Sequence, residues 1–397
     1  MRSYRIGSAF GIPIELDLTF LIILPLLAYL IGTQAGDWVT ILNQTLGSSI
    51  VAEPLTTNTM RLVLGVVAAV GLFAGVVLHE LGHSLVAMRY GFPISSIRLW
   101  LFGGVAQLTE MPEDWRQELT IAVAGPLVSI VLGVVSYVGF RAVPATGTLA
   151  PVKFVLGYLA IMNVTLAAFN LLPGFPMDGG RVLRALLARS RPYAEATRVA
   201  AEVGKGFALL LGLFGLFGGG GLFLVAIAFF IYIGASSEAQ QTTMKAAFQG
   251  VAVRDIMTPA EDLRLVSPDT SVADLIERMF RERHTGYPVV EDGRVVGVVT
   301  LGDAQQVDAV EREAYTVEEV MSTEVQSITP DADAMDALTR MQQNGVGRLL
   351  VMEGDDLQGL ISRTDLMTAF DIVKESGAAQ LGRRSVGEAE ADGPATR

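Results

Sequence analysis

The chain has 397 residues, of which 51% are hydrophobic and 18% are charged, and its formal net charge is −12. Long uncharged runs in such a composition predict a polytopic membrane protein, with enough length left for a second, soluble domain. The negative charge disfavours nucleic acid as a partner. The absence of cysteine excludes disulfides, thiolate metal ligands and cysteine nucleophiles.

Six apolar runs along the chain predict six membrane spans. They are residues 18–31, 62–88, 119–140, 154–172, 207–217 and 222–233. The last two runs are short, and four glycines, Gly218–Gly221, separate them. Because each glycine weakens a helix interior by about 1 kcal/mol relative to alanine, we expect two spans there, with five spans in total as the alternative. The first run follows Arg2 and Arg5, but no convincing signal-peptidase pattern comes after it, so we expect it to be retained.

Lys and Arg residues in the loops predict the orientation of these spans. If the N-terminus is cytoplasmic, the inside loops hold eleven of them, and the outside loops hold three, namely Arg61, Arg141 and Lys153. We therefore expect a multi-pass protein of the cell membrane whose N-terminus and C-terminal domain both lie in the cytosol.

The second apolar run leads into the sequence His79-Glu80-Leu81-Gly82-His83, which contains two of the three histidines of the chain. Residues i and i+4 share a helix face, so both imidazoles can ligate one zinc ion, and Glu80 can act as general base on the attacking water. Two structural histidines are the alternative. Ionisable residues that continue an uncharged run are costly in lipid unless they serve a site, which favours a metal site inside the membrane.

A third metal ligand is expected from another membrane segment, and Asp178 is the best candidate. It follows Pro173 and Pro176 in a stretch that breaks the fourth span, Asn170–Gly180. Irregular backbone at membrane depth persists only where protein or a water-filled cavity satisfies its polar groups. The alternative is an ordinary helix exit in which Asp178 caps the next helix.

The segment Gly91–Glu110, directly after the predicted metal helix, is predicted to form β-strands. It is rich in Ile, Leu, Val and aromatic residues, including Trp100 and Phe102, and glycines interrupt it. A sheet edge beside the metal could accept an unwound substrate as an added strand. A packed interfacial hairpin is the alternative.

The HELGH motif and the NLLPGFPMDGG segment resemble, position by position, the two motifs of the site-2 protease family of intramembrane zinc metalloproteases. The resemblance implies that His79, His83 and Asp178 bind one Zn2+ ion per chain. It implies that Glu80 is the general base and that Asn170 holds the substrate or its oxyanion. It further implies a polytopic α-helical membrane domain with a short re-entrant β segment, and a transmembrane protein in the lipid bilayer as substrate.

Two shorter similarities to the family lie between these motifs, at Ala124-Gly125-Pro126 and at Gly103-Gly104-Val105. The resemblance covers residues 1 to about 240. We expect the membrane domain to occupy residues 1–235, followed by a polar linker at residues 236–250.

Residues 251–372 contain an internal repeat, with copies at about 251–306 and 317–372. Each copy has an amphipathic helix and a pair of strands, and the two resemble a tandem CBS pair, a compact α/β module. The resemblance implies that an adenine nucleotide binds through a hydroxyl and a carboxylate in each copy: Thr300, Asp303, Ser362 and Asp365. A module that only forms a homodimer is the alternative.

Glycine, alanine and charged residues dominate the tail 377–397, which is expected to be disordered. Taken together, the motifs predict an intramembrane zinc metalloendopeptidase with a regulatory CBS pair. A CBS-regulated transporter and a catalytically silent membrane sensor are the alternatives. The transporter would not require Glu80 between two histidines or Asp178 behind a broken span, and the silent sensor would require the loss of one of these residues, none of which is lost.

Overall fold

The computed structural model describes residues 3–100, 103–108, 112, 114–354 and 356–376. The chain divides into two compact units, Met1–Thr242 and Thr243–Arg397. The predicted disordered tail 377–397 and Phe102 of the predicted β segment lie outside the described residues.

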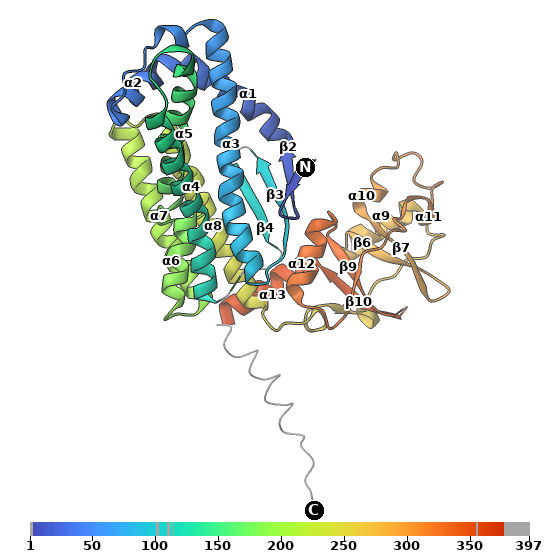
Figure 1. Cartoon of the computed structure of the whole chain (residues 1–397). Helices are drawn as coiled ribbons and strands as arrows, with labels where there is room; N and C mark the ends of the chain where they lie inside the picture. The colour runs from blue at the N-terminus through green and yellow to red at the C-terminus, as the bar shows by residue number, and fades with distance from the viewer. Residues whose placement is uncertain (1–2, 101–102, 109–111, 113, 355, 377–397) are drawn as a thin grey trace, which may run out of the picture. The chain divides into compact units, whose positions relative to one another are not determined.

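The first unit is built mainly of helices. As labelled in Figure 1, they are α1 (Leu18–Thr33), α2 (Ala35–Leu46), α3 (Asn58–Arg89), α4 (Trp115–Ala142), α5 (Ala150–Asn170), α6 (Asp178–Ala188), α7 (Tyr193–Phe217) and α8 (Gly221–Phe248). Among the described residues, α3, α4, α5 with its preceding turn, α7 and α8 are long and apolar enough to cross a membrane. The pair α1 and α2, bent by 68°, is a sixth span if both helices belong to one crossing. A helical membrane domain is thus confirmed, and the choice between five and six spans stays open.

Helix α7 begins at Tyr193, well before the apolar run at residues 207–217 that predicted it. Its first half also carries small side chains that are buried, namely Ala196, Ala200, Ala201 and Gly204. Small residues let neighbouring helices approach closely, and a hydropathy pattern does not detect them. Helix α8 likewise continues through most of the expected linker, as far as Phe248.

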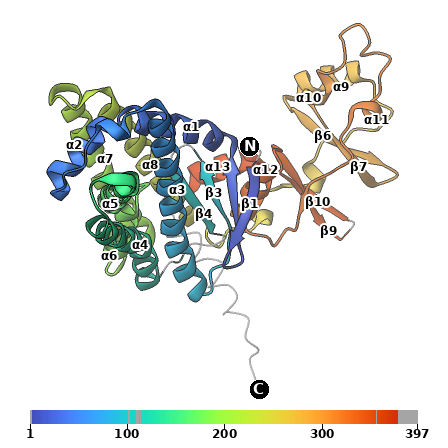
Figure 2. The ribbon, with the colours of Figure 1, turned by 45° about the horizontal axis from the view of Figure 1, so that its top comes forward.

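A four-stranded sheet lies against α3, with the strand order β1 (Ser3–Ala9), β2 (Ile12–Asp17), β3 (Ile94–Trp100) and β4 (Gly103–Leu108). The β segment predicted after the HELGH motif is therefore present, as the antiparallel pair β3 and β4. Strand β3 pairs with β2 in parallel. Figure 2 shows this sheet on one side of α3, and α4, α5 and α6 on the other.

The hairpin of β1 and β2 was not predicted from the sequence. Its turn consists of Phe10 and Gly11, which both have positive φ angles, as a two-residue hairpin turn requires. Ile12 and Ile97 of the sheet pack with Leu81 of the HELGH motif in one buried cluster. The N-terminal residues thus support the helix that carries the two histidines.

The second unit contains two copies of one helix-and-hairpin arrangement. In the first copy, α9 (Val272–Glu282) accompanies β6 (Gly286–Glu291) and β7 (Arg294–Thr300), and α10 (Leu301–Ala304) follows. In the second, α12 (Ala334–Gln343) accompanies β9 (Arg348–Glu353) and β10 (Asp356–Ser362), and α13 (Arg363–Ser376) follows. The short elements are β5 (Thr258–Pro259), α11 (Val317–Val320) and β8 (Ser327–Ile328).

Each copy has its own hydrophobic core, built from equivalent positions. Met279 of α9 and Val299 of β7 are buried in the first core, and Met341 of α12 and Ile361 of β10 are buried in the second. Phe248, the last residue of α8, is also fully buried in the second core. The amphipathic helix predicted in each copy is present, as α9 in the first and α12 in the second.

Candidate metal and catalytic centre

Three side chains predicted as metal ligands converge in the interior of the first unit. His79 and His83 project from one face of α3, and Asp178 is the first residue of α6. Asp178 Oδ2 lies 3.2 Å from His79 Nε2 and 3.1 Å from His83 Nε2, and the two Nε2 atoms are 3.2 Å apart. The exposed fractions of the three residues are 3%, 4% and 8%.

This geometry fits a tetrahedral metal ion. Ligand atoms 2.0–2.1 Å from a tetrahedral zinc are separated from one another by about 3.3 Å, close to the three distances between Asp178 Oδ2 and the two Nε2 atoms. The three ligand atoms all lie within 4.8 Å of one another. Lone pairs that face each other in an apolar interior need a cation or a proton between them, and this set offers nitrogen and oxygen donors suited to zinc.

Helix α4 orients both imidazoles. His83 Nδ1 lies 2.7 Å from the carbonyl oxygen of Ile121, and His79 Nδ1 lies 2.9 Å from Ser129 Oγ. A carbonyl oxygen only accepts, so His83 Nδ1 carries the proton and its Nε2 presents a lone pair to the cluster. Ser129 can accept from His79 Nδ1 in the same way. Partners of this kind fix the tautomer and direction of metal-ligating histidines.

Two glycines allow the neighbouring elements to approach the HELGH helix. A Cβ atom on Gly125 of α4 would lie 2.1 Å from His83 Nε2, and a Cβ atom on Gly104 of β4 would lie 2.6 Å from Glu80 Cγ. Any larger side chain at either position would displace a residue of the centre. The short AGP and GG sequences are thus explained by close packing around the site.

Asp178 is held by a compact loop, residues 171–177, which joins α5 to α6. The structure does not use its carboxylate as the helix cap: Met177 is the N-cap residue, without a side-chain hydrogen bond, while Asp178 Oδ2 points to the imidazoles. Gly179 and Gly180 have no room for a Cβ atom, because it would meet Leu172 O at 2.1 Å and Phe175 N at 2.6 Å. The two glycines therefore let α6 begin directly against the loop.

The two remaining predicted residues are placed differently. Glu80 is half-buried on α3 and packs against Gly104 at the sheet. Asn170 is the last residue of α5, and its Nδ2 donates to Leu166 O at 3.1 Å within its own helix. The neighbouring Asn163 also donates back along the helix, to Leu159 O, and is buried.

Both halves of the chain match known protein families. Residues 67–150 and 141–211 match the model of peptidase family M50, and residues 253–307 and 317–372 match that of the CBS domain. A zinc metalloprotease from Methanocaldococcus jannaschii is 34% identical over 372 residues, which cover 94% of this chain and 97% of that protein. The chain belongs to peptidase family M50.

Two further proteins are similar to the chain. Rip3 of Mycobacterium tuberculosis is 35% identical to this M50 peptidase, over 78% of this chain and 82% of that protein. The solved structure of a site-2 protease from Methanocaldococcus jannaschii is 35% identical, covers 60% of this chain and 95% of that chain, and superposes with a TM-score of 0.40. As a site-2 protease with a tandem CBS pair, the chain is a zinc metalloprotease of the intramembrane class.

The CBS pair of this M50 peptidase has two cavities at the predicted nucleotide residues. Thr300 and Asp303 line one of about 390 Å³, and Ser362 and Asp365 line another of about 370 Å³. In both, the carboxylate accepts from the hydroxyl and from the backbone N–H of the Thr or Ser, at 2.6–2.9 Å. These four residues therefore also cap the helices that follow them.

Arg348 lines both of these cavities. Its Nη2 donates to Thr285 Oγ1 at 3.1 Å, and Gly286 leaves room for the guanidinium. Burial lowers the pKa of Arg348 below its ordinary value, while the carboxylates of Asp365 and Asp303 act in the opposite direction. The sequence analysis did not identify Arg348. Its position depends on the packing of the second repeat against Thr285 and Gly286 of the first, which no local sequence pattern reveals.

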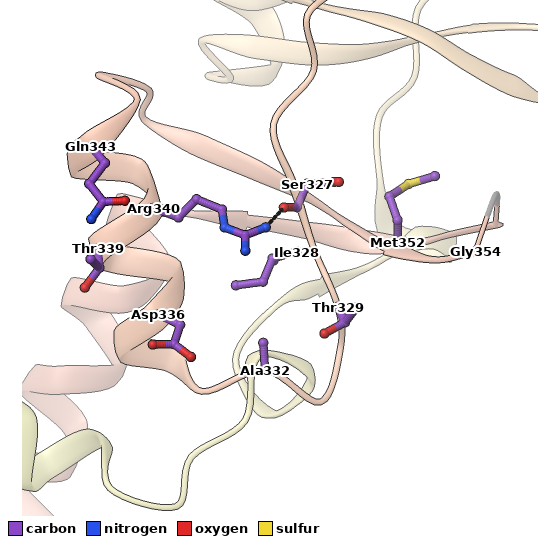
Figure 3. A pocket seen from close by; sticks show the side chains of 10 residues that line it. All are labelled: Ser327, Ile328, Thr329, Ala332, Asp336, Thr339, Arg340, Gln343, Met352 and Gly354. Carbon is purple, nitrogen blue, oxygen red and sulfur yellow. Dashed lines mark hydrogen bonds between the residues drawn. The ribbon is translucent and has the colours of Figure 1, made fainter. Parts of the chain in front are cut away.

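A third cavity, of about 440 Å³, lies between α12 and β8 and contains none of the predicted residues. Figure 3 shows Arg340 reaching from α12 to the backbone of Ser327, where its Nη1 donates to the carbonyl oxygen at 2.5 Å. Arg278 makes the same contact with Leu265 O in the first repeat. The arginine contact is thus a repeated feature of the fold.

Substitution of either predicted ligand should remove the metal. We expect about one tightly held zinc per chain in detergent-purified wild type, and loss or strong weakening of binding in His83→Ala and in Asp178→Ala, because two ligands do not complete the site. Elemental analysis of tag-free protein measures the stoichiometry. His284→Ala, which removes the one histidine outside the motif, is the matched control. Folded wild type that holds no zinc would refute the assignment.

Proposed function

We propose that the chain hydrolyses peptide bonds within transmembrane segments of membrane proteins, with zinc held by His79, His83 and Asp178. The convergence of these three ligand atoms in the membrane unit carries the proposal. Bound there, zinc supplies Lewis-acid activation of the water and of the scissile carbonyl. Neither a transporter nor a silent sensor requires three metal ligands that converge beside the carboxylate of Glu80.

Glu80 is proposed as the general base. It follows His79 directly on α3, so its carboxylate faces the space next to the ligand set rather than joining it. In this role it accepts the proton of the attacking water and passes it to the leaving amide nitrogen. Its approach to Gly104 supports a reaction site at the border between α3 and β4.

Strand β4 is proposed to receive the substrate. It is an edge strand of the sheet in the described residues, since its neighbour in the strand order is β3 alone. An extended peptide that adds beside β4 would have its carbonyl groups exposed close to Glu80. In a helical substrate, these carbonyl groups are engaged in the hydrogen bonds of the helix. Unwinding into an added strand would make the scissile carbonyl accessible to the catalytic groups.

Asn170 is proposed to hold the substrate or its oxyanion. Its amide now donates to Leu166 O, and a side-chain rotation would free this donor for the reacting carbonyl. A comparable oxyanion donor in another hydrolase is worth about 3 kcal/mol of transition-state stabilisation. Its place at the end of α5, directly before the loop that carries Asp178, supports this role.

Two variants test the proposed base and the proposed placement of the substrate, one each. Glu80→Gln removes the base, and Trp100→Asp places a charge at the end of β3, where this strand pairs with Gly103 of β4. Both should abolish cleavage of a single-span reporter protein in proteoliposomes while zinc stays bound. Cleavage is measured by the appearance of the product on gels. Glu195→Gln, on the surface of α7, is the control and should cleave normally. Full activity of Glu80→Gln would rule out its proposed role.

The CBS pair is proposed to bind an adenine nucleotide at Thr300 with Asp303 and at Ser362 with Asp365. Each pair presents a hydroxyl and a carboxylate to a cavity of suitable polarity, and Arg348 adds a positive charge. A nucleotide held there would regulate the peptidase. The helix-capping bonds of the same residues give them a structural role as well.

Calorimetric titration with AMP and with ATP tests the nucleotide sites. We expect binding to wild type and a loss of about tenfold in affinity in Asp303→Asn and in Asp365→Asn, since each variant weakens a charge-assisted bond to ribose. Asp336→Asn, at the cavity of Figure 3, should bind as wild type does. If neither AMP nor ATP gives a heat of binding with wild type, the CBS pair would be a module for dimer formation instead.

Both termini and the CBS pair are proposed to lie in the cytosol of a cell-membrane protein, as the loop charges indicate. Because the chain has no cysteine, single cysteines can report its topology. A cysteine at Thr146, in the α4–α5 connection, should react with an impermeant maleimide in intact cells, and one at Glu313, in the CBS unit, only after permeabilisation. The reverse labelling pattern would show the opposite orientation.

Light scattering of the purified protein measures whether it is a homodimer.

A further inference from the structure

An arginine that no step of the proposed reaction uses is buried on α6, the helix that begins at Asp178. Arg184 of α6 is 1% exposed. Its Nε donates to Glu118 Oε1 at 2.7 Å, and its Nη1 donates to Glu238 Oε1 at 2.5 Å. Glu118 belongs to α4 and Glu238 to α8, so one guanidinium joins three helices. Charges removed from water are costly even when paired, so their retention calls for a reason.

The same guanidinium also contacts the loop that carries the third ligand. It stacks on Phe175 at 4.9 Å from the ring centroid and on Tyr193 of α7 at 4.8 Å. Phe175 is 1% exposed and lies three residues before Asp178. A planar guanidinium can stack and form directed hydrogen bonds at the same time, which a lysine ammonium cannot do. Arg184 therefore fixes both the loop and the helix on either side of Asp178.

Helix α4 connects this cluster to the histidines. It supplies Glu118 to Arg184, the Ile121 carbonyl to His83 and the Ser129 hydroxyl to His79. The segment with Asp178 and the two imidazoles are thus each fastened to the same helix. A shift of α6 along α4 would separate Asp178 Oδ2 from the Nε2 atoms.

We infer that Arg184 is a positioning residue for the metal centre, which sets the place of Asp178 relative to His79 and His83 through its bonds to α4. The inference rests on the proposed zinc site. Arg184 touches neither the metal ligands' donor atoms nor the substrate in this role. Its effect is on the geometry of the ligand set, and so on metal affinity.

Zinc affinity, measured by competition with a chromogenic chelator on purified full-length protein, tests the inference. We expect Arg184→Lys to bind zinc 10- to 100-fold more weakly than wild type, the range found when partners that orient metal ligands are changed. Arg191→Lys, which alters an exposed ion pair with Glu195, is the control and should retain wild-type affinity. The melting temperature of the metal-free protein is recorded for each variant.

A second variant covers the case in which Arg184→Lys fails to fold. The double variant Arg184→Met with Glu118→Gln removes both charges of the deeply buried pair, and it leaves only Glu238, whose side chain is 26% exposed to solvent, without its partner. It too should fold and lose zinc affinity. Unchanged zinc affinity with a lowered melting temperature would overturn the inference and leave Arg184 as a stabilising residue. Wild type without zinc in the same assay would instead refute the proposed metal site itself.

Discussion

The convergence of two imidazole nitrogens and one carboxylate oxygen in an apolar interior imposes the strongest constraint on this molecule. Polar groups at membrane depth must be satisfied by protein or ligand, because lipid offers no hydrogen bonds. His83 and His79 are therefore fastened to α4 at their Nδ1 atoms, and both Nε2 atoms face Asp178. The packing of α3, α4 and α6 follows from the need to bring these groups together.

Close approach is the second requirement, and glycines meet it at three contacts around the centre. Gly125 admits His83, Gly104 admits Glu80, and Gly179 admits the carbonyl groups of the loop before Asp178. None of these glycines carries a chemical group that could react. A buried site therefore depends on the space that neighbouring residues leave as well as on the ligands that they supply.

The sequence predicted the parts of the structure that depend on local pattern. The HELGH helix, the broken span before Asp178 and the helices of both CBS repeats follow from periodicity and spacing, and the structure has them at the expected residues. The pattern did not reveal the β1–β2 hairpin, the partner role of Ser129 or the Arg184 cluster. These depend on contacts between residues 50 or more positions apart, such as Ser129 with His79, or on a turn too short to stand out.

Arg348 belongs to both clefts of the CBS pair, and this sharing has a consequence for how they fill. A single guanidinium can neutralise the charge of one anionic ligand at a time. An anion bound in one cleft would therefore reduce the attraction that the other cleft exerts on a second anion, because the bound negative charge offsets the positive charge of Arg348. The two clefts are electrostatically dependent, and a binding isotherm with two unequal steps is the expected sign of such negative cooperativity.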